Sequence, residues 1–323
     1  MIDLKSPLAC VWEITNRCNF FCPHCRAYTE SPEDNPKIEN VIISQLVGSE
    51  VLSVNISGGE PLLNPRIFTI IQELTRNNID VGISTNGFIF KDKAYHLLDA
   101  GINFIQISID GSREFHDSFR GVKGAFDRAI ESIVLAKKMG LFVQMNTTIT
   151  ASNMQYIFKN IALAERLGID RIFFRRVVAA GLASQNNVIP DKTAYIDLLK
   201  LLLEYKYSGS AHINISIDDP IIAVLDSSRY DKESICCSAG IMSLGIDSSG
   251  NVFPCIFARN IIGNLMTDSL DEIWKNNSLL KKIRHRKINV CGECEYKTSC
   301  GGCRGADGIL EWDHMCPIIN NCI

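Results

Sequence analysis

The sequence predicts an α/β fold, in which a partial (β/α)6 barrel of parallel strands is followed by a small, cysteine-rich domain. Two observations predict it. Short β-rich runs alternate with amphipathic helical patterns along the first two-thirds of the 323 residues, as expected of βα units. The 13 cysteines lie in two groups, with none between Cys25 and Cys236. A doubly wound sheet is the alternative arrangement of the same elements.

Six runs rich in β-branched and aromatic residues predict the strands. They cover residues 9–15, 50–57, 79–85, 102–109, 141–149 and 169–176. Because the runs are nearly continuous in apolar residues, we expect a sheet that is buried on both faces and therefore parallel. In either arrangement the active site should lie at the carboxyl ends of the strands.

Apolar residues at three- and four-residue steps predict the helices that cover this sheet. The segments are 66–77, 91–101, 124–140 and 154–168. Three of them end on a glycine, which is the residue most favoured just after a helix. These are Gly101, Gly140 and Gly168.

The amino-acid composition changes after the predicted barrel. We divide the chain into a barrel over residues 1–207, a connecting strand and turn over 208–233, and a domain over 234–323 that is rich in Gly and Cys. A segment as small as the last can bury little core, so we expect metal crosslinks to stabilise it.

Composition and charge exclude several classes of partner. A hydrophobic content of 46%, a charged content of 21% and a net charge of −3 are ordinary for a globular protein and give no basic footprint for nucleic acid or an anionic membrane. Asp3 and Lys5 interrupt any secretory signal, and no run is long enough to span a bilayer. We expect a cytoplasmic protein, in which clustered cysteines bind metal rather than form disulfides.

Polar residues follow the ends of successive predicted strands. Cys18-x3-Cys22-x2-Cys25 follows the first strand, and "SGGEPL" follows the second. The later strands end in "STNG" (84–87), "SIDG" (108–111), "NTT" (146–148) and the pair Arg175 and Arg176. Each is ordinary turn chemistry when taken alone, but together they indicate one site. Three thiolates in one loop suggest an iron–sulfur cluster with one iron left open.

Cys-x3-Cys-x2-Cys after the first strand, with Gly-Gly-Glu after the second, resembles the radical S-adenosylmethionine (SAM) superfamily. The resemblance implies that Cys18, Cys22 and Cys25 hold a [4Fe–4S] cluster whose open iron binds the amino and carboxylate groups of SAM. Reduction then cleaves SAM to methionine and a 5′-deoxyadenosyl radical, which abstracts hydrogen from the substrate.

The resemblance also assigns SAM contacts. The Gly58-Gly59-Glu60 segment is implied to receive the SAM ammonium group. Four polar residues after the third and fourth strands are implied to approach the ribose and the methionyl part: Ser84, Asn86, Ser108 and Asp110.

Three further residues are compared with the superfamily pattern. Arg120 in "HDSFRG" resembles the arginine that pairs with the SAM carboxylate, a contact that suits a planar guanidinium. His24 occupies a position that is often taken by an aromatic residue near the adenine in that superfamily. Arg26 stands where many relatives have Tyr or Phe.

The C-terminal cysteines give a second metal signal. Cys291-x2-Cys294-x5-Cys300-x2-Cys303 could alone be a zinc ribbon. With "GNVFPC", "IGNL" and "SLDEIW", the segment resembles the SPASM extension, which houses two auxiliary [4Fe–4S] clusters, so that three clusters are implied in all. The implied outer ligands are Cys291, Cys294, Cys300 and Cys316, and the implied inner ligands are Cys237, Cys255 and Cys303.

Three cysteines have no assigned cluster. Cys236 adjoins Cys237, and neighbouring residues on a strand point to opposite faces, so the fourth ligand of the inner cluster stays open. Cys10 is most simply a buried apolar residue. Cys322 has no assignment.

The resemblance implies an enzyme but leaves its substrate open. We expect modification of a ribosomally made peptide by crosslinking or oxidation. Because the first strand begins near residue 9, a leader-peptide-binding module would be a separate protein. The alternative is a small-molecule reaction, such as trimming of a tetrapyrrole or dehydrogenation of a sugar, with Arg175 and Arg176 binding a substrate carboxylate. A flavodoxin- or ferredoxin-type protein would donate electrons. An electron carrier or zinc protein is the remaining class, and it leaves "SGGEPL" and "SIDG" without a purpose.

Overall fold

The structure is a computed structural model that describes residues 4–26, 34–230, 234–258, 260–287, 290–305 and 313–318. Within these ranges ten strands form one sheet in the order β10-β9-β8-β1-β2-β3-β4-β5-β6-β7. The strands are β1 (Ala9–Thr15), β2 (Ser53–Gly58), β3 (Asp80–Thr85), β4 (Phe104–Ser108), β5 (Phe142–Ile149), β6 (Arg171–Arg176), β7 (Asn214–Asp218), β8 (Ser243–Ile246), β9 (Asn251–Phe253) and β10 (Gly263–Asn264).

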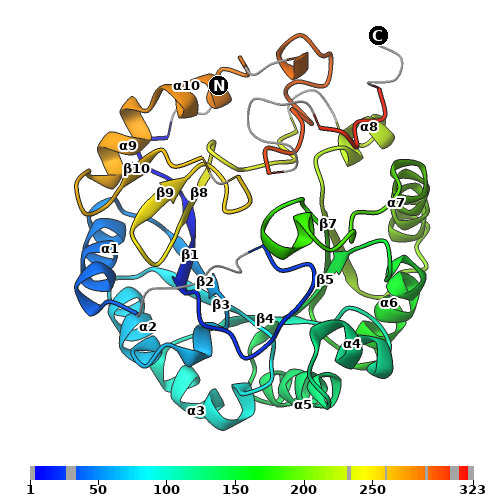
Figure 1. Ribbon diagram of the computed structural model, residues 1–323, viewed down its shortest axis with the longest axis horizontal. Coiled ribbons are helices and arrows are strands. Elements are labelled where there is room, and N and C mark those ends of the chain that lie inside the picture. Colours follow the sequence, from blue (N-terminus) through cyan, green and yellow to red (C-terminus); the bar gives the residue numbers. More distant parts are fainter. Residues whose placement is uncertain are drawn as a thin grey trace.

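The helices lie around the outside of the curved sheet (Figure 1). They are α1 (Pro36–Gly48), α2 (Ile67–Arg76), α3 (Phe90–Ala100), α4 (Arg113–Arg120), α5 (Ala125–Lys138), α6 (Ile157–Arg166), α7 (Lys192–Tyr207), α8 (Ile222–Leu225), α9 (Leu270–Asn276) and α10 (Ser278–Arg284). Short 3₁₀ turns are η1 (Pro61–Leu63), η2 (Met154–Tyr156), η3 (Gly181–Ser184) and η4 (Val290–Gly292).

The strand order confirms the predicted partial barrel. Strands β1 to β7 are neighbours in chain order, and each pair is parallel. A doubly wound sheet would reverse its strand order at a switch point, and no such reversal occurs between β1 and β7. The parallel run is longer than the six predicted strands, because β7 joins β6 within the segment we read as a connection.

The two faces of the strands differ more than the sequence suggested. The outward residues are apolar and pack under the helices, as Val54 and Ile56 of β2 do. The inward residues of β2, β4 and β5 include Asn55, Gln106 and Gln144, which line a cavity. The reading of near-continuous apolar strands was therefore wrong for the inner face. Those strands alternate, and the sheet is parallel because helices cover its outer face.

The C-terminal segment extends the same sheet. Strand β8 pairs with β1 in parallel, and β9 and β10 follow in antiparallel pairing. The indole Nε1 of buried Trp274 in α9 donates to the carbonyl oxygen of Leu4 at 2.8 Å, and the backbone N–H of Leu270 donates to Gln45 Oε1 in α1 at 3.0 Å. One hydrophobic core therefore runs through both parts.

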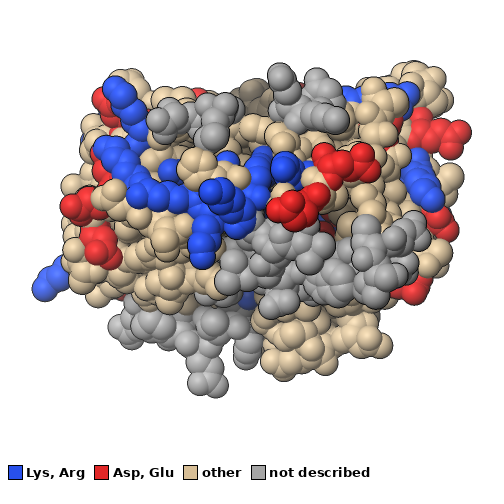
Figure 2. Space-filling model, turned by 90° about the horizontal axis from the view of Figure 1, so that it is seen from above, with Lys and Arg blue, Asp and Glu red and all other residues tan. Residues whose placement is uncertain are grey.

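The surface shows no membrane-spanning feature among the residues described, since none of their helices is both long and apolar enough to cross a bilayer. Figure 2 views the face at the top of Figure 1 and shows Lys and Arg side chains gathered in a band, with Asp and Glu beside it. The last turn of α10 is also basic, with Lys281, Lys282 and Arg284.

Candidate active site and cysteine clusters

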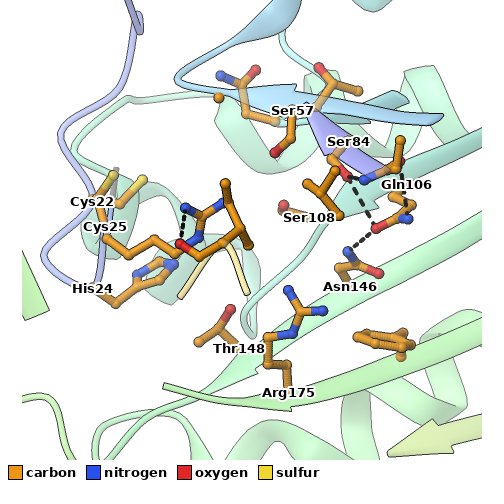
Figure 3. A pocket seen from close by; sticks show the side chains of 18 of the residues that line it. Cys22, His24, Cys25, Ser57, Ser84, Gln106, Ser108, Asn146, Thr148 and Arg175 are labelled. Carbon is orange, nitrogen blue, oxygen red and sulfur yellow. Dashed lines mark hydrogen bonds between the residues drawn. The ribbon is translucent and has the colours of Figure 1, made fainter. Parts of the chain in front are cut away.

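A cavity of about 440 Å³ opens inside the barrel. Its walls bring together ten of the predicted site residues, from four separate strand ends and α4: Cys18, Cys22, His24, Cys25, Gly58, Gly59, Ser84, Asn86, Ser108 and Arg120. Figure 3 shows Cys22, His24 and Cys25 on one side and Ser84, Gln106 and Asn146 on the other. Two predicted contacts, Glu60 and Asp110, are fully buried and do not line the cavity.

The cysteine loop after β1 presents its thiols without committing them to disulfides. Cys18 is exposed, Cys22 is buried, and Cys25 is partly buried. Burial is the main cause that raises the pKa of Cys18 to about 11 and that of Cys22 to about 12. Both thiols are therefore protonated until a metal replaces the protons, which is the usual coupling of metal binding to pH.

Neighbouring backbone fixes this loop in place. The N–H of Leu182 in η3 donates to the carbonyl oxygen of Cys25 at 2.8 Å. A Cβ at Gly181 would stand 2.6 Å from the carbonyl oxygens of Cys25 and Arg26, and its φ is +57°. Only glycine allows both the close approach and this backbone conformation.

Gly58 and Gly59 bring the end of β2 against the start of the same loop. The Gly59 N–H donates to the Thr15 carbonyl oxygen at 2.8 Å. Added Cβ atoms would lie 2.2 Å from the carbonyl oxygens of Thr15 and Arg17, respectively. The Gly-Gly pair therefore has a packing role, and its predicted contact with the SAM ammonium stays a prediction.

Glu60 joins β2 to β3. One carboxylate oxygen accepts from the Leu62 N–H at 3.1 Å and the Thr85 hydroxyl at 2.8 Å, and the other accepts from the Asn86 N–H at 2.8 Å. Burial raises its pKa to about 7. Both oxygens are thus used within the protein in this structure, so a bond from Glu60 to SAM stays a prediction.

Asp110 and Arg120 form a buried ion pair beside the cysteine loop. Arg120 Nε donates to Asp110 Oδ2 at 2.7 Å. Burial, the largest single cause, raises the pKa of Asp110, but the charge and hydrogen bond of Arg120 together with the neighbouring His24 and His116 outweigh it, and the net shift is downward. The other Asp110 oxygen, Oδ1, is buried with no hydrogen-bond partner in the described chain. Arg120 lines the cavity with its charge already paired, so a bond from it to the SAM carboxylate stays a prediction.

His24 belongs to an aromatic stack at the cavity wall. Its ring is 4.8 Å from that of Phe119 at an angle of 5°, and Phe119 lies 5.1 Å from Phe115. Burial lowers the pKa of His24 to about 4. A neutral, flat ring lies at this place, and its contact with an adenine stays a prediction.

The opposite wall is a hydrogen-bonded network of amides and a hydroxyl. Asn55 donates to Ser84 Oγ at 2.9 Å, Ser84 donates to Gln106 Oε1 at 3.2 Å, and Asn146 donates to the same oxygen at 2.7 Å (Figure 3). We had not predicted Asn55 or Gln106 as site residues, whereas Asn146 belongs to the "NTT" segment that the sequence singled out. Polar residues at every second position of β2, β4 and β5 were the available signal.

The C-terminal cysteines line two further cavities. One is bordered by Cys291, Cys294, Cys300 and Cys316, which is the set predicted for the outer cluster. The other is bordered by Cys237, Cys255 and Cys303, the set predicted for the inner cluster, and Cys236 is absent from its wall. Cys236 is not on a strand, contrary to our expectation; its N–H donates to the Ser299 carbonyl oxygen at 3.1 Å.

Single ions and clusters require different arrangements of these cysteines. Among the described residues, no three His, Cys, Asp or Glu side chains are placed to hold one metal ion. A zinc ribbon needs four ligands around one ion, whereas the ligands of a [4Fe–4S] cluster bind different irons.

Two arginines near these cysteines also fit an anionic cluster. Arg304 is 3% exposed, and none of its three side-chain nitrogens has a hydrogen-bond partner in the described structure. Arg286 donates to the Thr298 carbonyl oxygen at 3.0 Å but leaves Nη1 without a partner. Cluster sulfurs would be suitable acceptors.

Arg176 and Arg175 are paired within the protein, in contrast to the substrate role that we considered. Arg176 donates two parallel hydrogen bonds to the Asp313 carboxylate, at 2.8 and 2.7 Å. Its Nε lies 3.3 Å from Asp219 Oδ2. Arg175 Nε donates to Asp218 at 2.6 Å. Their charges are neutralised, so the structure does not support free carboxylate receptors at these positions.

Arg26 connects the two cysteine regions, a role that the sequence did not reveal. Its guanidinium pairs with buried Glu13 of β1 and lies 4.7 Å from the centre of the Phe257 ring. Arg175 lies 4.5 Å from the same ring. Phe257 follows Cys255 by two residues, so this stack links the loop of Cys25 to a loop of the C-terminal cysteines.

Two further cysteines, Cys10 and Cys322, lie outside the predicted ligand sets. Cys10 is 1% exposed and packs in the core of β1, as predicted. Cys322 lies outside the described residues.

Comparison with known proteins accounts for both cysteine regions. The profile of the Radical SAM superfamily matches residues 12–164, and that of SPASM, an iron–sulfur cluster-binding domain, matches residues 236–303. The mycofactocin maturase MftC of Mycobacterium ulcerans is 30% identical, over 94% of this chain and 84% of that protein.

This chain belongs to the radical SAM superfamily. As a radical SAM protein with a SPASM domain, it is an enzyme whose cofactors are SAM and iron–sulfur clusters. The AdoMet-dependent heme synthase of Oleidesulfovibrio alaskensis is another relative, 28% identical over 94% of this chain and 84% of that protein.

Solved radical SAM structures share the fold. Streptococcus suis SuiB bound to S-adenosylmethionine has a TM-score of 0.77 at 21% identity, covering 97% of this chain and 78% of that one. The anSMEcpe structure with bound AdoMet has a TM-score of 0.74 at 19% identity, covering 97% and 95%.

Proposed function

We propose that this radical SAM enzyme abstracts hydrogen from a ribosomally made peptide and leaves it crosslinked or oxidised. Two comparisons support a peptide. The mycofactocin maturase is 30% identical, and SuiB with its precursor peptide SuiA shares the fold with a TM-score of 0.76.

The observation that carries the proposal is the single cavity that joins the Cys18, Cys22 and Cys25 loop to the polar inner wall of the barrel. SAM bound at that loop would supply the 5′-deoxyadenosyl radical. The chain itself would hold the adenine beside His24, keep Arg120 charged beside the loop, and shield the site from water within the barrel.

We propose three [4Fe–4S] clusters, held by the three cysteine sets described above. Anaerobic purification and reconstitution, followed by iron, sulfide and zinc analysis, tests this count. About twelve irons per chain supports three four-iron clusters. About four irons with zinc would mean that the C-terminal cysteines hold structural zinc instead.

The second candidate is a small-molecule reaction, either decarboxylation or side-chain trimming of a tetrapyrrole in a haem pathway, or dehydrogenation of a sugar. A specific observation favours the tetrapyrrole. The spacing Cys300-x2-Cys303 is shorter by one residue than the usual SPASM pattern, and the AdoMet-dependent heme synthases are 28% identical over almost the whole chain.

Label transfer separates the two candidates. Reduced holoenzyme is incubated either with a deuterated short peptide encoded beside its own reading frame or with a deuterated propionate-bearing tetrapyrrole. Deuterium in 5′-deoxyadenosine identifies the substrate class. Transfer from the tetrapyrrole alone would overturn the peptide proposal.

We further propose a cytoplasmic location, an external flavodoxin- or ferredoxin-type electron donor, and a separate leader-peptide-binding protein. The basic last turn of α10 would suit a donor with an acidic surface. Reduction by flavodoxin should therefore slow as ionic strength rises. A rate that does not depend on salt would argue against this contact.

A further inference from the structure

Arg171 lies at the floor of the active-site cavity, at the opposite end of the strands from the cysteine loop. It is the first residue of β6, as Phe104 and Phe142 are the first residues of β4 and β5. The centre of its guanidinium lies 5.8 Å from the Phe104 ring and 5.2 Å from the Phe142 ring. Strand alternation places it on the same inward face as Phe173 and Arg175, and all three line the cavity.

The charge of Arg171 is not balanced within the described structure. Four other arginines line the cavity, and each has a carboxylate partner: Arg26 with Glu13, Arg120 with Asp110, Arg175 with Asp218, and Arg176 with Asp313. Arg171 has neither an ion pair nor a side-chain hydrogen bond in the part of the chain described, and its Nε is buried. No Asp or Glu lies among the described residues of the cavity wall.

The neighbouring polar side chains cannot supply the missing charge. Gln144 donates to Asn146 Oδ1 at 2.6 Å, and Gln106 donates to Asn55 Oδ1 at 3.4 Å. These amides are neutral and bond to one another. Burial lowers the pKa of Arg171, but an arginine keeps its proton in proteins. The floor therefore holds one positive charge in partly apolar surroundings, between two aromatic rings.

We propose that Arg171 binds a carboxylate of the substrate at the floor of this cavity. The inference rests on the proposed function and deepens it, since it names the chemical group by which the substrate is held. A guanidinium matches a carboxylate with two parallel hydrogen bonds. The substrate would enter with its acid end toward β4, β5 and β6, so that its reacting carbon lies between the floor and the cysteine loop.

The carboxylate could belong to a small organic acid, to the C-terminus of a peptide, or to an internal Glu side chain. Three pairs of probes distinguish these sources, and each pair replaces a carboxylate with a neutral amide of the same shape. They are 3-phenylpropionate and 3-phenylpropanamide, N-acetyl-Ala-Phe with a free or an amidated C-terminus, and N-acetyl-Ala-Glu-Ala-amide and its Gln counterpart.

Binding is measured by calorimetry on reconstituted, SAM-loaded enzyme that is kept oxidised, so that no turnover occurs. We expect at least one acid to bind about tenfold or more tighter than its amide, because a charge-assisted hydrogen bond contributes at this level. Arg171→Gln should abolish the preference, and Arg171→Lys should retain part of it. Arg166→Gln, an exposed arginine on α6, should retain all of it.

Iron content and SAM binding of each variant show that it is folded. The proposal is overturned if the wild type binds none of the acids, if it binds acid and amide equally, or if folded Arg171→Gln keeps the preference. Reductive SAM cleavage by the wild type is measured separately. Cleavage without any acid preference defeats this inference alone, whereas absence of cleavage defeats the proposed function.

Discussion

The two cysteine regions each have a buried arginine beside them, and the two arginines are neutralised over very different lengths of chain. Arg120, near Cys18 and Cys22, pairs with Asp110 only ten residues away. Arg176, near Cys303, pairs with Asp313, which is 137 residues away. The Arg120–Asp110 pair can therefore form within one βα unit, whereas the Arg176–Asp313 pair requires the whole chain to close.

We expect the largest effect when the first cysteine region loses a ligand and the C-terminal region keeps all of its ligands. Cys22→Ala should abolish formation of 5′-deoxyadenosine while about eight of the twelve irons remain, because only the SAM-binding cluster loses a ligand. Chromatography of the products and iron analysis measure the two quantities. Cys10→Ala, in the core of β1, is the control and should keep every iron. Undiminished SAM cleavage by Cys22→Ala would contradict the assignment of the loop.

The converse change affects the outer set. Cys294→Ala should retain some SAM cleavage but form no product, because Cys294 does not line the cavity with the predicted SAM contacts and we propose that the auxiliary clusters act on the substrate. Mass spectrometry of the substrate and assay of 5′-deoxyadenosine check the two halves. Full turnover by this variant would show that the outer cluster is dispensable.

Substitutions at two separate glycines, Gly181 and Gly168, test whether η3 positions the loop of Cys18, Cys22 and Cys25. Gly181→Ala should lower SAM cleavage by about 10²-fold, since the new methyl group would displace the backbone of Cys25 and Arg26 and small displacements at a reacting centre are costly. Gly168→Ala is the matched control. Its φ is +58° and nothing lies within 4 Å of its added Cβ, so it carries the backbone strain alone, roughly 1 kcal/mol. Equal SAM cleavage by the two variants would show that η3 does not position the first loop.

The long-range ion pair should contribute mainly to stability. Asp313→Asn removes one of the two carboxylates beside buried Arg176 and leaves Asp219 at 3.3 Å, so the loss of unfolding free energy should approach, but not exceed, the cost of about 3–5 kcal/mol for a fully broken buried pair. Anaerobic urea unfolding measures the change. Glu131→Gln, in an exposed pair with Lys91, should cost less than about 1 kcal/mol. A similar small loss for both would mean that the C-terminal closure does not depend on Asp313.

The smallest expected effect is on the pH dependence of the unfolding free energy, through His116 beside the Asp110–Arg120 pair. Burial lowers the pKa of His116, which accepts a bond from the Asp110 N–H at 3.2 Å, from 6.5 to about 4. Between these values the unfolded chain binds a proton that the folded chain does not, so stability falls as pH falls. The slope is about 1.4 kcal/mol per pH unit from this imidazole.

Urea midpoints between pH 6.5 and 5.5 measure this slope. His116→Gln should flatten it, and His96→Gln, at an exposed position on α3, should not. An unchanged slope in His116→Gln would place the pH dependence elsewhere.

Sequence reasoning succeeded where the chemistry is local. The carboxyl ends of the six predicted strands lie within one residue of those of β1 to β6, and the turn residues after them converge because parallel strands share one carboxyl edge. It did not predict contacts between residues that are far apart in the sequence. Nothing near Arg176 indicates Asp313, and nothing near Cys25 indicates that Arg26 meets Phe257.

The inner face of the barrel was misread for a different reason. Isolated amides such as Asn55 and Gln106 look like interruptions of apolar strands. Only closure of the barrel shows that they lie on one surface and satisfy one another.

The pairing of β8 with β1 has a consequence for biosynthesis. Strand β1 lies between β2 and β8, so during translation one of its edges has no partner until residue 246 has left the ribosome. An unpaired edge invites association with other chains. Until then, the cysteine loop that follows β1 lies on a sheet that is still open on the side where the last third of the polypeptide will dock.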